Sequence, residues 1–257
     1  MTASPTEAPA TAAAYVYGVV AAEAIPPIER QGVADARVRA IAEGSVAALV
    51  SGLPPGELRI RRRDLLSHLH VLEDAFAEGT VVPCAFGMVL SSEEAVRSEF
   101  LEPRHDELAG LLRRLDGHAQ LNLRVAYAED VVLQEIVAGD PTIAQLREQT
   151  RGLSEEAGYS MRMRLGELVA AALAAVRERD GQMILERLAP KAADIVVDDP
   201  GEDVLKASFL VAGKDAEAFD REIERVAEEQ APRLRIDVVG PLPPSAFATL
   251  EQGAWDS

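Results

Sequence analysis

The chain has 257 residues, 48% of them hydrophobic and 27% charged, a composition that is usual for globular proteins and excludes global disorder. Its 43 acidic and 26 basic residues give a net charge of -17 at pH 7, so the average field repels nucleic acid phosphates and anionic lipid headgroups. We therefore expect no nucleic-acid partner and no membrane partner. At roughly 100 to 200 residues per domain, the length predicts two domains.

The N-terminal part of the sequence shows no signal for secretion. No Lys or Arg precedes Arg30, so the positively charged region of a signal peptide is missing. The weakly apolar run at residues 12–22 is too short to span a bilayer. Cys84 is the single cysteine, so the chain can form no intramolecular disulfide and no thiolate zinc cluster. These observations predict a cytoplasmic protein in a reducing compartment.

The first predicted domain covers residues 15–128. It follows a tail at residues 1–14, which is rich in small residues, contains two prolines and is expected to be flexible. The β-branched and aromatic run at residues 15–20 predicts a first, central strand. Residues 46–50 predict a second strand, and turn residues follow it at 53–56.

A helix is expected after this turn, with Asp64 as its N-cap and one apolar face toward the core. Four residues at spacings of four, three and four form that face: Leu65, Leu69, Leu72 and Phe76. Residues 81–87 predict an edge or terminal strand because Pro83 cannot donate to a ladder. A helix with a capping box that begins at Ser91 and an alternating strand at 121–125 complete the domain, on an antiparallel or mixed sheet.

The second predicted domain covers residues 129–257. Residues 141–187 are almost entirely helix-forming and predict one long helix. Its inward stripe has spacings of four, three, four and three and consists of Met161, Leu165, Leu168, Ala172 and Ala175. Residues 195–197 and 204–211 predict two strands on either side of an acidic loop. A helix and a returning strand follow, so residues 204–239 are expected to form a βαβ crossover, and the predicted fold class is α+β with two lobes.

The sequence contains no catalytic, cofactor-binding or metal-binding motif, so we expect a protein that is not an enzyme. Cys84 lacks the signature of a nucleophile and is expected to be a small buried apolar residue. His68 and His70 lie about 200° apart on a helix, which is wrong for binding one metal ion together. The acidic loop at 198–203 lacks the ligand order of a calcium loop, and the Gly-Lys pair at 213–214 lacks the preceding glycine pattern of a phosphate loop.

A stiff segment at residues 240–247 follows the last predicted strand, because three prolines restrict its backbone. We expect this segment to lie against the protein's own surface, where it either docks a partner or only holds down the end of the chain. The candidate partner-binding residues are Pro241, Leu242, Pro243, Pro244, Ser245 and Phe247.

Three segments have an order and a spacing that extend over nearly the whole chain, at residues 15–20, 82–87 and 239–247. Together they resemble the gas vesicle protein L/F family (GvpL/GvpF). The family pattern usually has other side chains at three positions, which are Ala85, Leu242 and Ser245. The usual side chains there are arginine, tryptophan and an aromatic residue. Because such side chains commonly anchor interfaces, this chain is expected to differ from the family in how strongly it binds the same partner surface.

The resemblance implies a non-enzymatic accessory protein of gas vesicle assembly, in the cytoplasm and associated with gas vesicles. Its expected partners are the hydrophobic shell protein and other gas vesicle accessory proteins, and its expected fold has a ferredoxin-like N-terminal domain. The acidic charge is compatible with this role, since a charged partner keeps an apolar subunit dispersed. A ferredoxin-like module that binds a small regulatory molecule, or an enzyme of unfamiliar type, is an open alternative. The sequence predicts neither the oligomeric state nor which vesicle protein is contacted.

Overall fold

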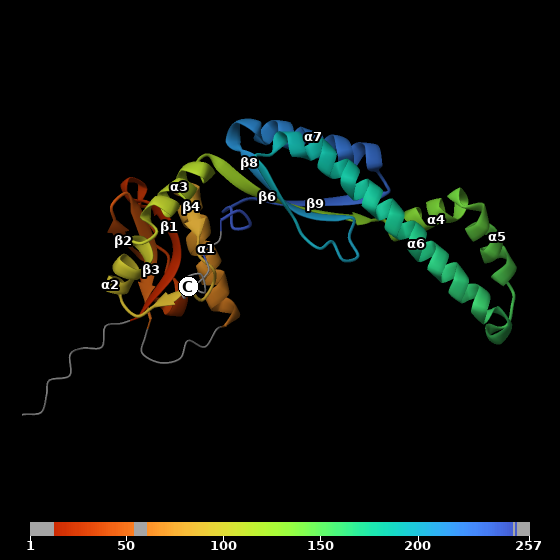
Figure 1. The fold of residues 1–257 in the computed structure, drawn as a ribbon, viewed down its shortest axis with the longest axis horizontal. Helices are drawn as coiled ribbons and strands as arrows, with labels where there is room; N and C mark the ends of the chain where they lie inside the picture. The colour runs from red at the N-terminus through yellow and green to blue at the C-terminus, as the bar shows by residue number, and fades with distance from the viewer. Residues whose placement is uncertain (1–12, 54–60, 249, 251–257) are drawn as a thin grey trace, which may run out of the picture. The chain divides into compact units, whose positions relative to one another are not determined.

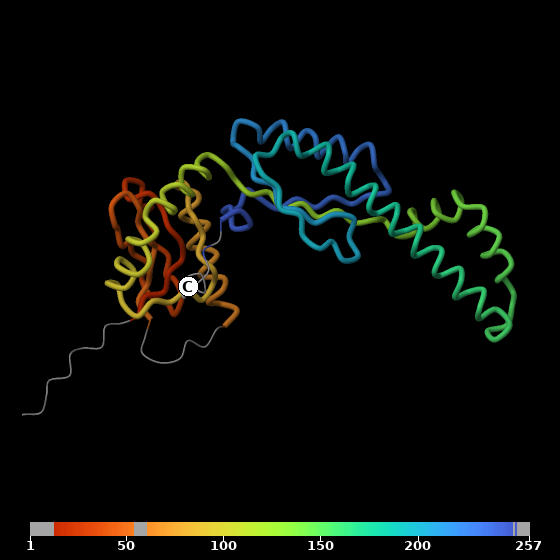
Figure 2. Tube along the Cα trace, viewed as in Figure 1, coloured from red at the N-terminus to blue at the C-terminus, as the bar shows by residue number. Residues whose placement is uncertain are grey.

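The computed structural model describes residues 13–53, 61–248 and 250. Contacts divide the chain, traced in Figures 1 and 2, into unit 1 (residues 1–120 and 241–257) and unit 2 (residues 121–240). Each unit combines helices with one sheet, which confirms the predicted α+β class with two lobes.

This division differs from the expected boundary after residue 128. The chain returns to unit 1 after it has formed unit 2, so unit 2 is an insertion into unit 1. Local sequence patterns carry no information about which unit a distant C-terminal segment contacts. The expected tail at 1–14 and the expected turn at 53–56 fall mostly on residues 1–12 and 54–60, which lie outside the described residues.

Unit 1 is built on a five-stranded sheet with the first strand at its centre. Its strands are β1 (Ala14–Ala21), β2 (Arg39–Glu43), β3 (Val46–Gly52), β4 (Val81–Pro83) and β5 (Val89–Leu90). The order is β2-β3-β1-β4, β5 also pairs with β1, and the paired strands run antiparallel. Every residue from Ala14 to Val20 is buried, so the apolar run predicted β1 and its central place correctly.

The helices of unit 1 are α1 (Arg62–Glu78), α2 (Glu93–Ala95), which continues as a π-helical turn (Val96–Leu101), and α3 (His105–Leu115). Two predicted caps are displaced. Arg61 rather than Asp64 is the N-cap of α1, and the Asp64 carboxylate accepts the Arg61 N–H at 3.0 Å. Ser92 rather than Ser91 caps α2, because its hydroxyl oxygen accepts the Ala95 N–H at 3.0 Å. Both arrangements still satisfy N–H groups at a helix start.

The strand order of unit 1 follows a ferredoxin-like plan. Helix α1 connects β3 to β4, and β1 lies between these two strands, which is the split β-α-β arrangement of that fold. The connection from β1 to β2 contains two 3-10 turns, Ala22–Ala24 and Val33–Asp35, where the complete fold has a helix. The expected ferredoxin-like N-terminal domain is therefore present in its strand order, with its first helix replaced.

Unit 2 has the complete β-α-β-β-α-β order. Its strands are β6 (His118–Tyr127), β7 (Asp194–Val197), β8 (Leu205–Ala212) and β9 (Leu234–Leu242), arranged as β7-β8-β6-β9. Helix α7 (Ala216–Gln230) connects β8 to β9, which lie on either side of β6. The predicted βαβ crossover is thus present in split form, with a strand from earlier in the chain at its centre.

The single long helix predicted for residues 141–187 is two helices. After α4 (Glu129–Gly139), the chain forms α5 (Pro141–Thr150) and α6 (Glu155–Leu188). Gly152 interrupts them with φ +80, a left-handed conformation that glycine tolerates. Ser154 then caps α6, because its hydroxyl oxygen accepts the Ala157 N–H at 3.3 Å. The break allows α4 and α5 to pack on α6, with Val132, Ile136 and Ile143 buried.

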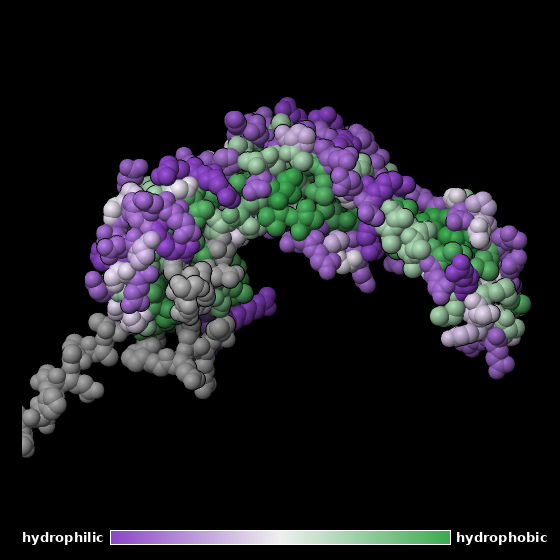
Figure 3. Space-filling model, viewed as in Figure 1, coloured by the Kyte–Doolittle hydropathy of each residue, from purple (hydrophilic) through white to green (hydrophobic). Residues whose placement is uncertain are grey.

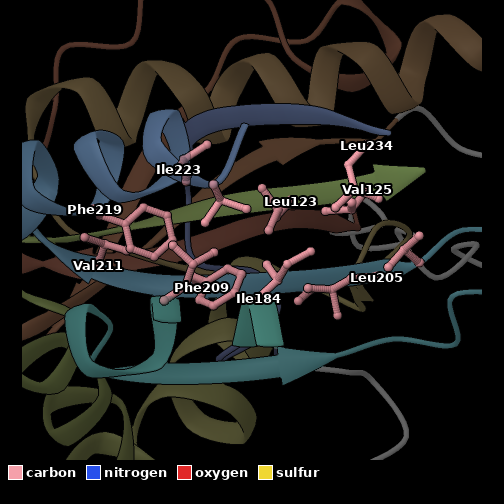
Figure 4. Close-up of a cluster of buried hydrophobic side chains, with 13 residues drawn as sticks. Leu123, Val125, Ile184, Leu205, Phe209, Val211, Phe219, Ile223 and Leu234 are labelled. Atoms are coloured by element: carbon pink, nitrogen blue, oxygen red, sulfur yellow. The ribbon is translucent and has the colours of Figure 1, made fainter. Parts of the chain in front are cut away.

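The core of unit 2 lies between its sheet and the helices α6 and α7 (Figure 4). The rings of Phe209 on β8 and Phe219 on α7 have centroids 5.1 Å apart, and Ile184 of α6 belongs to the same cluster. Leu123 and Val125 of β6 are two residues apart and so point to the same side of the strand. The outer surface of α7 is hydrophilic (Figure 3), as expected of a helix that buries one face.

Candidate partner-binding surfaces

Helix α1 turns a mixed polar and apolar face toward the core of unit 1. Its buried residues are Asp64, His68, Val71, Leu72 and Ala75. Of the four residues predicted to face inward, Leu72 is buried and Phe76 is half-buried, whereas Leu65 and Leu69 are exposed at 40% and 43%. The predicted inward face is therefore wrong in its N-terminal half, because the leucine spacing takes no account of two polar side chains that are held inside.

Three leucines of α1 face solvent, since Leu66 is also exposed at 43%. We call Leu65, Leu66 and Leu69 the leucine surface. Residues three and four positions apart are neighbours on a helix, so Leu69 adjoins both of the others. Single exposed apolar residues are common, but neighbouring ones form a patch, and such patches mark protein interaction sites.

His68 is the side chain that places the polar half of α1 in the core. Its Nδ1 atom lies 3.0 Å from the Tyr15 hydroxyl, and the rings of Tyr15, Tyr17 and Phe86 surround it at centroid distances of 5.7, 5.6 and 5.6 Å. Burial lowers the pKa of His68 to about 4, although a backbone hydrogen bond with Cys84 acts in the opposite direction. The imidazole is therefore neutral at pH 7.

A second set of buried polar contacts surrounds Tyr17. Its hydroxyl lies 2.7 Å from Ser51 Oγ and accepts the Val33 N–H at 2.7 Å, while the Tyr15 hydroxyl accepts the Gly87 N–H at 3.0 Å. Burial raises the pKa of both tyrosines. Because these groups satisfy one another inside the core, they fix the packing of unit 1.

The cysteine and the other histidines have ordinary structural surroundings. Cys84 is 2% exposed and burial raises the pKa of its thiol, so it is a buried apolar residue as predicted. His105 Nε2 accepts the Ser45 N–H at 3.1 Å, and His118 Nδ1 lies 2.8 Å from the Asp116 carbonyl oxygen. Within the described residues, no group of three His, Cys, Asp or Glu residues could hold a metal ion, and no helix is long and apolar enough to cross a bilayer.

The predicted partner-binding segment lies against unit 1. Its six candidate residues differ in burial: Pro243 and Pro244 are buried, Leu242 and Phe247 are half-buried, and Pro241 and Ser245 are exposed. The Ala246 N–H donates to Gln120 Oε1 at 2.8 Å, and Arg114 Nη2 donates to the Phe247 carbonyl oxygen at 3.0 Å. Hydrogen bonds to Gln120 and Arg114 thus hold the segment in place. Its exposed candidate residues, Pro241 and Ser245, are the ones that a partner can reach.

Leu250 extends the sheet of unit 1 beyond this segment. It forms a parallel bridge with Cys84; its N–H donates to the Pro83 carbonyl oxygen at 3.0 Å, and its carbonyl oxygen accepts the Ala85 N–H at 2.8 Å. The side chain of Leu250 is 4% exposed. Strand β4 pairs with β1 on its other side, so Leu250 occupies the outer edge of this strand.

Unit 2 contains a cluster of charges that sequence reasoning missed. Arg233, just before β9, pairs with Asp180 of α6 and donates to Glu135 Oε2 of α4 at 2.7 Å. Its guanidinium lies 5.3 Å from the centroid of the Tyr127 ring, and the Tyr127 hydroxyl donates to Asp180 at 2.6 Å. These contacts tie α4 and α6 to the sheet. The residues of this cluster are far apart in sequence, so no local sequence motif indicates it.

Comparison with known proteins extends over both units. The gas vesicle synthesis protein GvpL/GvpF family matches residues 13–249. Gas vesicle protein F of a Streptomyces species is 33% identical over 240 residues, which are 91% of this chain and 98% of the relative. The crystal structure of GvpF from an Anabaena species matches with a TM-score of 0.78 at 25% identity, over 93% of this chain and 98% of that one. GvpF from Microcystis aeruginosa gives a TM-score of 0.72 at 23% identity, over 93% and 100%.

Proposed function

The chain belongs to the gas vesicle synthesis protein GvpL/GvpF family, and on this basis we propose that it is a non-enzymatic accessory protein that binds the hydrophobic shell protein or another accessory protein. Membership of the family assigns the chain to gas vesicle formation. The binding step, the cytoplasmic location and the association with the vesicle are parts of the proposal.

The leucine surface of α1 is the observation that supports binding of a hydrophobic partner. Burying apolar area stabilises a complex by about 25 cal/mol per Å². Leucines that are 40 to 43% exposed in the free chain therefore stabilise an interface when a partner buries them. A shell protein rich in apolar residues offers the complementary surface. We therefore infer that Leu65, Leu66 and Leu69 contact the shell protein.

The charge of the chain supports the same role in a different way. With a net charge of -17, copies of the protein repel one another and stay dispersed. A complex with an apolar subunit inherits this charge, which counters aggregation of the subunit before it is assembled. The apolar contact and the acidic remainder thus have separate tasks, namely capture and dispersal.

The test is co-expression of the shell protein with a tagged chain, followed by capture on the tag. The double change Leu65→Gln with Leu69→Gln removes two apolar side chains four residues apart and keeps a good helix former at both positions. We expect the amount of captured shell protein to fall about tenfold, since the interface loses two leucine side chains that the partner would bury. Equal melting temperatures would show that the fold is intact.

A matched control comes from α6, where Tyr159 and Met163 are also four residues apart and exposed at 65% and 52%. Tyr159→Gln with Met163→Gln should leave capture within about twofold of the wild type. Equal losses in both double variants would remove the leucine surface as the interface. A wild-type chain that captures neither the shell protein nor any accessory protein would overturn the proposed function itself.

The exposed residues of the C-terminal segment are a second proposed contact. Pro241 and Ser245 reach the surface from a segment whose buried prolines, Pro243 and Pro244, hold it in place. A surface that is ordered before binding loses little conformational entropy when a partner arrives. The same capture assay with Ser245→Arg therefore measures whether this segment contributes to binding.

A further inference from the structure

Unit 1 contains an open groove beside β2, which is an edge strand of its sheet. The volume of the groove is about 790 Å³, within the roughly 300–1,000 Å³ that is usual for ligand sites. The apolar part of its lining consists of Ile25, Pro26, Pro27, Ile28, Val38, Ala40 and Leu49. Ile25 is exposed at 44% and Ile28 is half-buried, whereas Val38 and Leu49 form the buried floor of the groove.

Three arginines line the same groove, in a chain whose net charge is -17. Arg30 and Arg39 form ion pairs with carboxylates of α1 and α2. Arg37 is exposed and has no ion-pair partner among the described residues. The lining itself contains one carboxylate, that of Glu29, and two of the three guanidinium groups already have carboxylate partners, so Arg37 is the cation that is open to a further partner. An exposed guanidinium beside apolar side chains favours a segment that carries carboxylates over one that carries ammonium groups.

The backbone of β2 adds hydrogen-bonding groups to the groove. The Ala42 carbonyl oxygen accepts a hydrogen bond from Arg97 Nη1 at 2.7 Å, so this carbonyl faces away from β3. Backbone groups alternate in direction along an antiparallel strand, which places the N–H and C=O of Ala40 on the same outer edge. Ala40 lines the groove. An extended segment in the groove therefore meets apolar side chains, guanidinium groups and the edge of a strand.

We propose that this groove binds an extended acidic segment of a partner protein, in which apolar side chains alternate with carboxylates. The apolar side chains pack on Ile25 and Ile28, and the carboxylates pair with Arg37 and, by exchange of partners, with Arg30. Exposed ion pairs contribute little to stability, so Arg30 gives up its own carboxylate easily. The inference goes beyond the proposed function, because it concerns a different surface and a partner of different chemistry.

The probe for this site is a short fluorescent peptide of alternating leucine and glutamate, titrated with the full chain and followed by anisotropy. A peptide of alternating leucine and lysine is the control for non-specific apolar binding. We expect the glutamate peptide to bind and the lysine peptide not to bind. Raising the salt from about 50 to about 500 mM should weaken binding, because the charges are partly exposed.

Arg37→Glu and Arg113→Glu form a matched pair of variants. Both residues are exposed in unit 1, and both changes move the net charge from -17 to -19, but Arg113 lies on α3 outside the groove lining. We expect Arg37→Glu to weaken peptide binding about tenfold and Arg113→Glu less than about twofold. Arg37→Gln, which removes the charge without reversing it, should give an intermediate loss. Equal effects of the matched variants would overturn the proposal.

The apolar half of the site is tested by Ile25→Ser, which should weaken the peptide several-fold with an unchanged melting temperature. The leucine-surface double variant should bind the peptide normally, so failure of this proposal is distinguishable from failure of the proposed function. Light scattering checks the other occupant. If the wild type self-associates and Arg37→Glu abolishes this, the groove holds a second copy, and the proposed partner segment is wrong.

Discussion

The hydroxyl of Tyr15 lies 3.0 Å from Nδ1 of His68, a contact that joins β1 to α1 inside unit 1. The Tyr15 oxygen also accepts the Gly87 N–H, and its own proton is available for donation to the imidazole. His68 also has a backbone hydrogen bond with Cys84. With Nδ1 accepting from Tyr15, the other ring nitrogen is the donor in that bond. The neutral ring is thus fully bonded, and a second ring proton at Nδ1 would remove the hydrogen bond donated by Tyr15.

This arrangement predicts that unit 1 loses stability in mild acid. The pKa of His68 is lowered from 6.5 to about 4, chiefly by burial. As the pH falls through this window, the unfolded chain takes up a proton at His68 that the folded chain does not bind. The contribution of the neutral His68 to the free energy of unfolding is therefore fully present above pH 6.5. It declines as the pH falls toward 4, by at most about 3 kcal/mol.

The measurement is urea denaturation of the wild type and of His68→Gln at about pH 7 and about pH 4.5. Carboxylates also titrate in acid, so the informative quantity is the difference in stability between the wild type and the variant. The variant should be less stable near neutral pH, and its disadvantage should shrink as the pH falls. A disadvantage that stays constant with pH would contradict the assigned role of His68.

A second prediction concerns the hydroxyl group of Tyr17, which serves both Ser51 and the Val33 N–H. Tyr17→Phe keeps the ring and leaves these two buried groups without their partner. We expect a loss of about 1–3 kcal/mol in the free energy of unfolding. Tyr159→Phe makes the same chemical change at a tyrosine that is exposed at 65%, and it should have almost no effect. Similar losses in both variants would contradict the prediction.

Two glycines of α6 give a third prediction with opposite signs. A methyl group on Gly181 would lie 2.9 Å from the Val204 carbonyl oxygen, whereas one on Gly166 would have nothing within 4 Å. Alanine favours helix over glycine by up to about 1 kcal/mol, so Gly166→Ala should stabilise unit 2. Gly181→Ala should destabilise it by about 1–3 kcal/mol, because backbone cannot move aside cheaply. Urea midpoints of the two variants measure this contrast.

The sequence predicted those elements whose signal is local. The run that contains Val16 and Val19 identified β1, because β-branched and aromatic residues in sequence have few alternatives to a buried strand. Helix α1 was found, but its inward face was not. The leucine spacing indicated Leu65 and Leu69 as inward residues. His68 is inside instead, because its hydrogen-bond partner Tyr15, 53 positions away, lies in the core.

Long-range pairing explains what could not be predicted about the surfaces. The sequence indicated that the segment around Ser245 is stiff, but its contact with Gln120 depends on the chain returning to unit 1. No sequence pattern marks the groove arginines as one site, since Arg30 and Arg37 are separated along the chain and the overall charge is acidic. Folding of the β1–β2 connection brings them to one groove, and no periodicity encodes that connection.

The last prediction separates the structural task of the C-terminal segment from its proposed binding task. Leu250 is 4% exposed and bonded to Pro83 and Ala85, so Leu250→Ala should lower the melting temperature, with a loss of about 2–5 kcal/mol. Ser245→Arg changes an exposed side chain and should leave the melting temperature unchanged. If the segment contacts a vesicle protein, Ser245→Arg weakens capture of that protein by steric and charge mismatch. Unchanged capture in this folded variant would mean that the segment only holds the chain against β4.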